Sequence, residues 1–340
     1  MTRSAPHHPL VIGHRGACGY RPEHTRASYE LAFALGADAV EPDIVATRDG
    51  VLVVRHENEI SGTTDVATHP EFADRRTTKH IDGVALTGWF TEDFTWAELA
   101  TLRARERIPA VRKSSASFDG RFPLLRLRDV FNLIDDVSID TPRPLGMVAE
   151  IKHATYFESI GLPLDELFAA EVNEAGWNEG DGRLVIESFE RHVLDQVYAR
   201  GIYGKRVYLI EASGKPFDEV ARHGSAAASY AESLTAAGLY ALAGHVDGVS
   251  VNKKLILDID ADGHVVGASE LVDSAHAAGL EIYCWTLRPE NKFLARSFRT
   301  GTAGANFGAW QAEFALIMGT GIDGVFADHP DLAVAVRNDL

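Results

Sequence analysis

The stretch Leu10–Gly16 reads Leu-Val-Ile-Gly-His-Arg-Gly, a short apolar run that ends in two basic side chains between glycines. Similar β-branched runs recur along the chain and alternate with longer amphipathic stretches, a rhythm typical of βα units. The strand-like runs are Leu10–Ile12, Ala39–Ile44, Met147–Ile151, Leu184–Ile186, Arg206–Ile210, Gly248–Val251, Ile282–Leu287 and Gly324–Phe326. This alternation predicts an α/β fold, a (β/α)8 TIM barrel. A doubly wound open sheet is the alternative, because periodicity alone does not say whether the sheet closes.

The stretches between these runs carry the signals of helices. The amphipathic segments are Arg26–Leu35, Leu164–Ala175, Arg191–Ala199, Glu270–Ala278 and Ala309–Met318. Thr25 is suited to cap the first of them, and glycines stand just past the ends of four helices at positions 36, 176, 201 and 279. Val51–Val54 is predicted to be an additional strand, hairpinned to the second barrel strand.

One long segment interrupts the rhythm. Residues 57–127 contain clusters of Gly, Pro, Thr and Asp without a clear βα unit. Active sites of barrels are built from the loops that follow the strands, so an insertion here predicts a lid or a substrate-recognition element. The alternative is a surface elaboration without a role. With this insertion included, residues 1–340 are expected to form a single barrel domain.

Composition restricts the partners. The 340 residues carry a net charge of −16, from 49 acidic and 33 basic side chains, which disfavours nucleic acids and anionic membrane surfaces as partners. Cys18 and Cys284 are the two cysteines, too few for a disulfide framework. No apolar run has the length of a membrane span, and the first residues do not resemble a secretory signal. A cytoplasmic protein is therefore expected, or a periplasmic or secreted one if a leader has been removed. The oligomeric state is left open.

Acidic residues gather at the ends of two predicted strands. Glu41 and Asp43 are two positions apart and so point to the same face, as do Glu150 and Lys152. Carboxylates that converge on one rim repel each other unless a cation lies between them, and a Lys or Arg bridge is the simplest such cation. Oxygen ligands without thiolates instead select a hard divalent cation, Ca²⁺ or Mg²⁺.

Two histidines complete the predicted rim. His14 ends the first strand, and His56 ends the strand that is hairpinned to the one bearing Glu41. One histidine can remove a proton from a nucleophile while the other protonates a leaving alkoxide. Arg15, Lys152 and a metal ion would neutralise the phosphoryl oxygens. The combination predicts cleavage of a phosphodiester.

Several motifs together resemble the glycerophosphodiester phosphodiesterase family, in particular bacterial members with an insertion after the second histidine. The matching stretches are His14–Gly16, Pro22–Thr25, Glu41–Asp43, Thr47–His56, Ala149–Lys152, Glu187–Glu190, Asn252–Lys253, Trp285–Thr286 and Asp323–Asp328. The resemblance covers most of the chain, and its first block is highly specific.

The resemblance implies a (β/α)8 barrel that uses a divalent cation and releases glycerol 3-phosphate and an alcohol from a small glycerophosphodiester. It implies metal ligation by Glu41, Asp43 and Glu150. It also implies acid–base catalysis by His14 and His56, phosphate binding by Arg15 and Lys152, and an aromatic wall for the glycerol at Trp285. Trp285 could equally be a core residue. Resemblance to the bacterial members favours Ca²⁺ over Mg²⁺.

The sequence departs from the family at three places. Glu57 stands where an Asp is usual, Gly62 stands near the place of a frequent Arg, and His24 replaces an Asn in many members. The departures at Glu57 and Gly62 concern the loop that faces the substrate rather than the rim, whereas the variant at His24 also occurs in the bacterial subgroup.

Two other patterns imitate metal sites. Asp258, Asp260, Asp262 and Gly263 match half of an EF-hand loop, but Ser269 occupies the place of the closing Glu. The flanking residues are strand-like, so a hairpin is the better prediction. His7-His8 resembles a metal pair, but its place near the terminus predicts solvent exposure instead.

Three other functions are alternatives to phosphodiester hydrolysis. A glycoside hydrolase does not require the paired histidines and cations of this rim. A phospholipase D-like lyase of the same superfamily, acting on lysophospholipids, is an alternative. A non-catalytic ligand-binding barrel would need a catalytic group to be missing, and none of those named above is missing.

Overall fold

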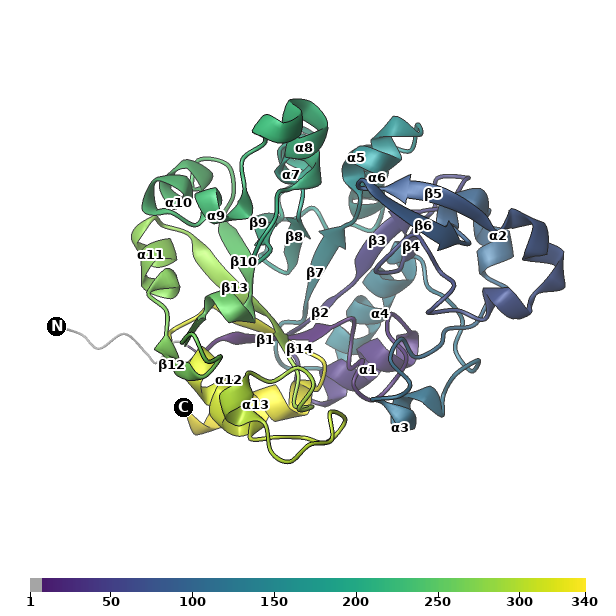
Figure 1. Ribbon diagram of the computed structural model, residues 1–340. Helices are drawn as coiled ribbons and strands as arrows, with labels where there is room; N and C mark the ends of the chain where they lie inside the picture. Colours follow the sequence, from purple (N-terminus) through teal and green to yellow (C-terminus); the bar gives the residue numbers. More distant parts are fainter. Residues whose placement is uncertain (1–7) are drawn as a thin grey trace.

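The computed structural model describes residues 8–340 and contains a closed parallel barrel (Figure 1). The barrel strands are β1 (Leu10–His14), β2 (Ala39–Glu41) with β3 (Asp43–Ala46), β7 (Gly146–Ile151), β8 (Leu184–Ser188), β9 (Lys205–Ile210), β10 (Gly248–Asn252), β13 (Glu281–Leu287) and β14 (Gly324–Ala327). The ring closes because β1 pairs in parallel with both β2 and β14. This confirms the predicted (β/α)8 barrel and excludes the open, doubly wound sheet.

The second barrel strand is interrupted, whereas the sequence predicted one continuous strand over Ala39–Ile44. Pro42 has no N–H to donate to a neighbouring strand, and the run divides there into β2 and β3. β2 pairs with β1 and β7, while β3 pairs with β7 and, in antiparallel fashion, with β4 (Leu52–Val54). The predicted hairpin between Val51–Val54 and the second strand is therefore present.

Helices surround the barrel, as Figure 1 shows. The five predicted helices are α1 (Arg26–Ala34), α6 (Leu164–Glu174), α7 (Arg191–Ala199), α11 (Leu271–Ala277) and α12 (Trp310–Met318), which confirms each prediction to within one residue at either end. Six further helices were not predicted: α4 (Leu127–Ile139), α5 (Ala154–Ser159), α8 (Phe217–His223), α9 (Tyr230–Ser233), α10 (Ala236–Leu242) and α13 (Pro330–Asp339). In α4 the cap residue is Arg126, and Asp129 accepts its backbone N–H at 2.9 Å, so the usual Ser, Thr or Asp signal is absent.

The segment 57–127 forms short elements rather than a βα unit. These are η1 (Val66–Thr68), η2 (Pro70–Arg75), the hairpin β5 (Thr77–Ile81) and β6 (Val84–Gly88), η3 (Thr91–Asp93), α2 (Trp96–Leu99) and α3 (Lys113–Ala116). The turn of the β5–β6 hairpin approaches α8, since a Cβ on Gly83 would lie 3.9 Å from the ring of Phe217.

The aspartate-rich segment is a hairpin, as predicted, and not an EF-hand. It consists of β11 (Leu257–Ile259) and β12 (Val265–Ala268), which follow η5 (Lys253–Leu255). The carboxylate of Asp260 accepts the backbone N–H groups of Asp262 and His264, so it closes the turn itself. Of the predicted exposed pair His7-His8, His8 is exposed and His7 lies outside the described residues.

Apolar residues pack in two places, inside the barrel and between its strands and helices. The inner cluster consists of Ile12, Ala39, Val148, Val185, Val207, Tyr283 and Phe326. The neighbouring residues Val11, Val40 and Ala149 point the other way, into the larger outer cluster. This alternation determines which side chains enter the barrel.

Within residues 8–340 no helix is long and apolar enough to cross a bilayer. Both cysteines are buried and free.

Replacing Ile12 by Ala is expected to lower the free energy of unfolding by about 2–5 kcal/mol, because the truncation leaves a cavity inside the closed barrel. Urea denaturation followed by circular dichroism measures the loss. The matched control is Ile139→Ala at a side chain that is 81% exposed, where the change should stay within about 0.5 kcal/mol. Equal losses in the two variants would contradict the assigned barrel interior.

Candidate active site

The polar rim of the barrel follows from the same alternation that fills its interior. Two residues beyond each member of the inner cluster, the chain places the next inward-facing side chain at the carboxyl end of the strand. Those positions are occupied by His14, Glu41, Glu150, Glu187, Leu209, Trp285 and Asp328. Most of them are polar, so the change from apolar to polar marks where the core ends and the site begins.

Three carboxylates converge at this rim. Glu41, Glu150 and Glu187 are all buried, and each offers an oxygen atom within 4.8 Å of the others. Both carboxylate oxygens of Glu187 are buried without a hydrogen-bond partner among the described residues. Because unpaired buried carboxylates are costly, this arrangement fits a hard divalent cation with oxygen ligands.

The raised pKa values of these carboxylates agree with a site for a divalent cation. Burial and the charge of Asp43 raise the pKa of Glu150 to about 8, despite the neighbouring ammonium of Lys152. Burial and the nearby carboxylates also raise the pKa of Glu41 and Glu187 well above their usual range. Glu187 was not among the predicted ligands, because the strand-like run had been ended at Ile186; its place in the alternation of β8 would have identified it.

Asp43, the third predicted ligand, lies beside this group rather than within it. Its buried carboxylate accepts from the ring of His24 at 2.8 Å and forms an ion pair with Lys152 Nζ at 3.2 Å. Burial acts to raise its pKa, but Lys152 and the histidines hold the pKa of Asp43 well below its usual range. The other ring nitrogen of His24 lies 2.8 Å from the hydroxyl of Tyr29, so the departure at position 24 provides a second buried support for Asp43.

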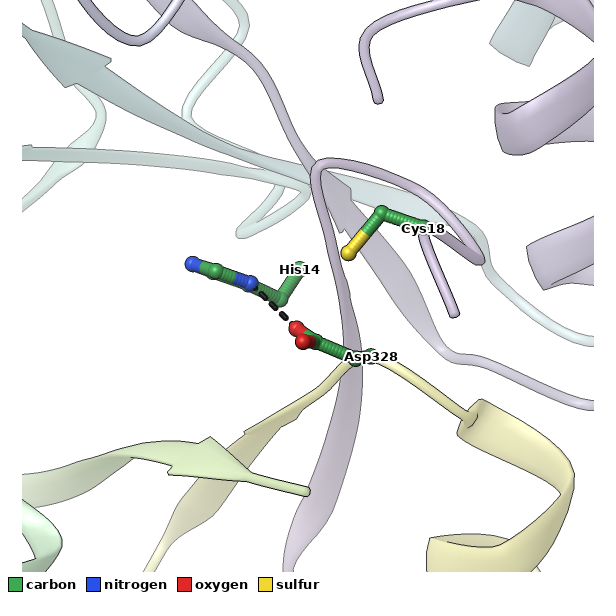
Figure 2. Close-up of side chains that lie close together, drawn as sticks. All are labelled: His14, Cys18 and Asp328. Atoms are coloured by element: carbon green, nitrogen blue, oxygen red, sulfur yellow. Dashed lines mark hydrogen bonds and ion pairs between the residues drawn. The ribbon is translucent and has the colours of Figure 1, made fainter. Parts of the chain in front are cut away.

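His14 is held by a carboxylate from the other end of the chain. Its Nδ1 lies 2.5 Å from Asp328 Oδ1 (Figure 2). Burial, followed by the charge of Arg15, lowers the pKa of His14 to about 4, while neighbouring guanidinium groups hold the pKa of Asp328 well below its usual range despite burial. The ionised Asp328 therefore accepts the Nδ1 proton of a neutral imidazole, which leaves Nε2 available to accept a proton.

Cys18 lies close to the His14–Asp328 pair, and its sulfur points toward them (Figure 2). These three residues could ligate a soft metal by type, but Arg112 and Arg288 both form ion pairs with Asp328. Two guanidinium groups oppose a further cation there. The arrangement therefore disfavours a second metal centre, and Asp328 positions His14 instead.

His56 has a carboxylate partner of its own. Its Nδ1 lies 2.5 Å from Glu57 Oε1, and Arg107 from the insertion binds both Glu57 and Glu23. Burial and the charges of Arg15 and Lys152 lower the pKa of His56 to about 3. Glu57, a departure from the family pattern, is thus long enough to hold the imidazole.

The two predicted phosphate ligands, Arg15 and Lys152, both form ion pairs with carboxylates of the site. Arg15 has a positive φ of 56°, and its side chain reaches Glu23 at 3.1 Å and Asp43 at 3.5 Å. Lys152 Nζ lies 2.6 Å from Glu150. Burial opposes their charge, but the surrounding carboxylates raise the pKa of both groups, so they remain cationic.

One cavity of about 1380 Å³ begins at the rim and is lined by both histidines, both phosphate-binding candidates and the three clustered glutamates: His14, His56, Arg15, Lys152, Glu41, Glu150 and Glu187. Asp43 does not line the cavity. Trp285 forms part of its wall and meets Phe189 edge to face, with 5.6 Å between the ring centroids. The cavity exceeds the roughly 300–1,000 Å³ that is usual for small-ligand sites.

A closed (β/α)8 barrel with polar, charged side chains gathered at the carboxyl ends of its strands defines the class of barrel enzymes. Residues 14–332 match the glycerophosphoryl diester phosphodiesterase family. The chain belongs to that family.

Individual relatives agree with this assignment. A glycerophosphodiester phosphodiesterase of Arabidopsis thaliana is 30% identical over 331 residues, which cover 94% of this chain and 83% of the plant protein. One from Bacillus subtilis is 46% identical over 220 residues, which cover 61% of each protein.

Solved structures share the fold. A family protein from Silicibacter pomeroyi has a TM-score of 0.67 at 22% identity, with 99% of this chain and 95% of that chain covered. A phosphodiesterase of Oleispira antarctica, in complex with its product sn-glycerol-3-phosphate, has a TM-score of 0.64 at 19% identity, with 97% of each chain covered.

The crowded carboxylates make stability depend on pH and on cations. The pKa of Glu150 is about 8 in the fold against a usual 4.5, so its stabilising contribution is present at low pH and lost as pH rises toward 8. The thermal midpoint of chelated protein should therefore fall between about pH 7 and about pH 8.5, above the range in which the lowered pKa values of His14 and His56 act in the opposite sense. Ca²⁺ or Mg²⁺ should raise that midpoint, and more so at the higher pH, where the ligands are deprotonated.

Differential scanning fluorimetry with chelator or with excess cation measures both effects. Glu187→Gln should reduce the rise in thermal midpoint that the cation causes. Glu270→Gln, at an exposed carboxylate between β12 and α11, should not. A midpoint indifferent to both cations at about pH 8.5 would argue against the metal site.

Proposed function

We propose that the protein hydrolyses glycerophosphodiesters to glycerol 3-phosphate and an alcohol, in a reaction that depends on a divalent cation and on His14 and His56. The observation that carries this proposal is the pair of histidines, each with Nδ1 2.5 Å from a carboxylate, on the same cavity as the three clustered glutamates. Membership of the family supports the substrate class.

Glu41, Asp43 and Glu150 are the proposed metal ligands, and Glu187 joins them because its oxygens are near and unpaired. A cation held there would polarise the phosphoryl group and help to neutralise its charge. Asp43 would orient toward the cation while it remains supported by His24 and Lys152. Oxygen ligands without thiolates favour Ca²⁺ or Mg²⁺. Ca²⁺ is the first choice because the sequence resembles the bacterial members of the family.

The proton transfers are assigned to the two histidines. One takes a proton from the attacking oxygen through Nε2, and the other gives a proton to the oxygen of the leaving alcohol, so that a P–O bond forms as another breaks. Asp328 and Glu57 fix the imidazoles through Nδ1. An anionic substrate would offset the positive charge of Arg15 and Lys152, and so would favour the protonated form of the histidine that acts as the acid.

Arg15 and Lys152 are proposed to bind the nonbridging phosphate oxygens, and Trp285 is proposed to stack against the glycerol. The insertion 57–127, within one domain of residues 1–340, is proposed to form part of the alcohol subsite. Its support is that Asp82, Gly83 and Val84 at the β5–β6 turn line the cavity. An acidic surface with local cations suits small diesters better than nucleic acids.

Replacing His14 or His56 by Ala is expected to lower kcat by about two to four orders of magnitude, because each removes a proton-transfer group. Steady-state kinetics under saturating cation measure the loss, and circular dichroism checks that the fold persists. His223→Ala, at a side chain that is 57% exposed, is the matched control and should leave kcat unchanged. Turnover near normal in either rim variant would remove that histidine from the mechanism.

A panel of glycerophosphodiesters tests the substrate class. Glycerol 3-phosphate should be released with cation and not after chelation, and it is measured by a coupled dehydrogenase assay. A lysophospholipid provides the decisive comparison. Turnover of the lysolipid alone, with a cyclic phosphate as product, would replace this proposal by a lyase.

A further inference from the structure

The wall of the active-site cavity is divided by charge. The part formed by residues 252–299, above β10 and β13, includes the cations Lys253, Lys254, Arg288, Lys292, Arg296 and Arg299. No carboxylate from this stretch lines the cavity. The part formed by the β5–β6 turn and by the loops after β8 and β9 contributes the carboxylates Asp82, Glu190 and Glu211, with Lys215 as its one exposed cation. So strong a local excess of positive charge contrasts with the net charge of −16.

Two of the six cations are neutralised by buried carboxylates. Lys253 Nζ lies 2.5 Å from Glu313, and Arg288 Nε lies 2.6 Å from Asp328. These two side chains therefore form part of the supporting structure and offer little charge to a ligand.

The other four cations are exposed and have no carboxylate partner among residues 8–340. Arg296 donates to the backbone oxygen of Asp262 at 2.8 Å, and Arg299 donates to that of Leu294 at 2.9 Å. Those bonds orient the guanidinium groups without cancelling their charge. Lys254 and Lys292 extend from neighbouring loops into the same cavity. Most other Lys and Arg side chains of the described chain form ion pairs, so this group is unusual.

The nearby acids do not neutralise this group. Asp260 of the adjoining hairpin closes its own turn, and Glu290 forms an ion pair with Arg112. Across the cavity, Asp82 binds His153 at 2.6 Å, and Glu190 accepts the backbone N–H of Thr155 at 2.9 Å. Asp82 and Glu190 thus each have a partner within the protein, whereas the four exposed cations have no carboxylate partner among residues 8–340.

From this asymmetry we infer that Lys254, Lys292, Arg296 and Arg299 form a second anion subsite, which binds a phosphate-type group on the alcohol moiety of the substrate. The inference deepens the proposed function and rests on it: the scissile phosphate occupies the rim, and a second one binds the basic wall. A cavity of about 1380 Å³ has space for such an extended diester. A choline or ethanolamine alcohol, which carries positive charge, gains nothing from this wall.

The test compares three diesters with alcohols of different charge: bis(glycerophospho)glycerol, glycerophosphoglycerol and glycerophosphocholine. Wild-type kcat/KM should be highest for the first, and its advantage should shrink as salt screens the wall. K254Q/K292Q should reduce that advantage, and adding R296Q and R299Q should lower kcat/KM for the doubly charged diester by about tenfold. The value for glycerophosphoglycerol should change by less than about twofold.

A matched variant, R76Q/K113Q/R121Q/R222Q, removes the same charge from exposed positions outside the cavity, and should preserve the substrate preference. An equal loss for all three diesters in the wall variants would show general steering and overturn the inference. The same holds if the wild type shows no preference. Failure of the wild type to hydrolyse any of them would instead overturn the proposed function, and the subsite with it.

Discussion

Alternation of side chains along the strands of a closed ring is the constraint on which the rest of this structure depends. Because successive residues point to opposite faces, each inward-facing apolar residue determines the position of the next inward-facing side chain on the same strand. Ile12 leads to His14, Val148 to Glu150 and Val185 to Glu187. Shifting any strand by one residue would bury the rim in the outer core and expose apolar side chains to the cavity. The packing of the core and the geometry of the site are therefore specified together.

The rim combines groups that would be costly to bury singly. Glu41, Glu150 and Glu187 crowd one side, and Arg15 and Lys152 lie next to them. Two fixed cations allow Asp43 to remain ionised, but neither of them pairs with either oxygen of Glu187. The balance of charge is incomplete in the protein alone, which is the condition expected where a cation and an anionic substrate bind.

Much of this arrangement could be predicted from the sequence because it depends on short-range periodicity. The positions of Glu41 and Glu150 follow from the alternation within one strand, and five amphipathic helices were predicted to within one residue. Glu187 was missed because the strand was ended too early, and the division at Pro42 was not anticipated although proline cannot donate in a ladder. Contacts between distant residues, such as that of Arg107 with Glu23 and Glu57, leave no signal in local periodicity. The same holds for the basic wall, which comes from the separate segments that follow β10 and β13.

The pairing of β1 with β14 brings the first and the last barrel strand together, and with them His14 and Asp328. These residues are separated by 314 positions, so their hydrogen bond can form only once the last barrel strand has been synthesised. A nascent chain that lacks its final strand has an open sheet edge on either side of the gap and no partner for His14. Closure of the ring, with its high sequence separation, thus makes the support of His14 depend on the last barrel strand and not on the first βα units alone.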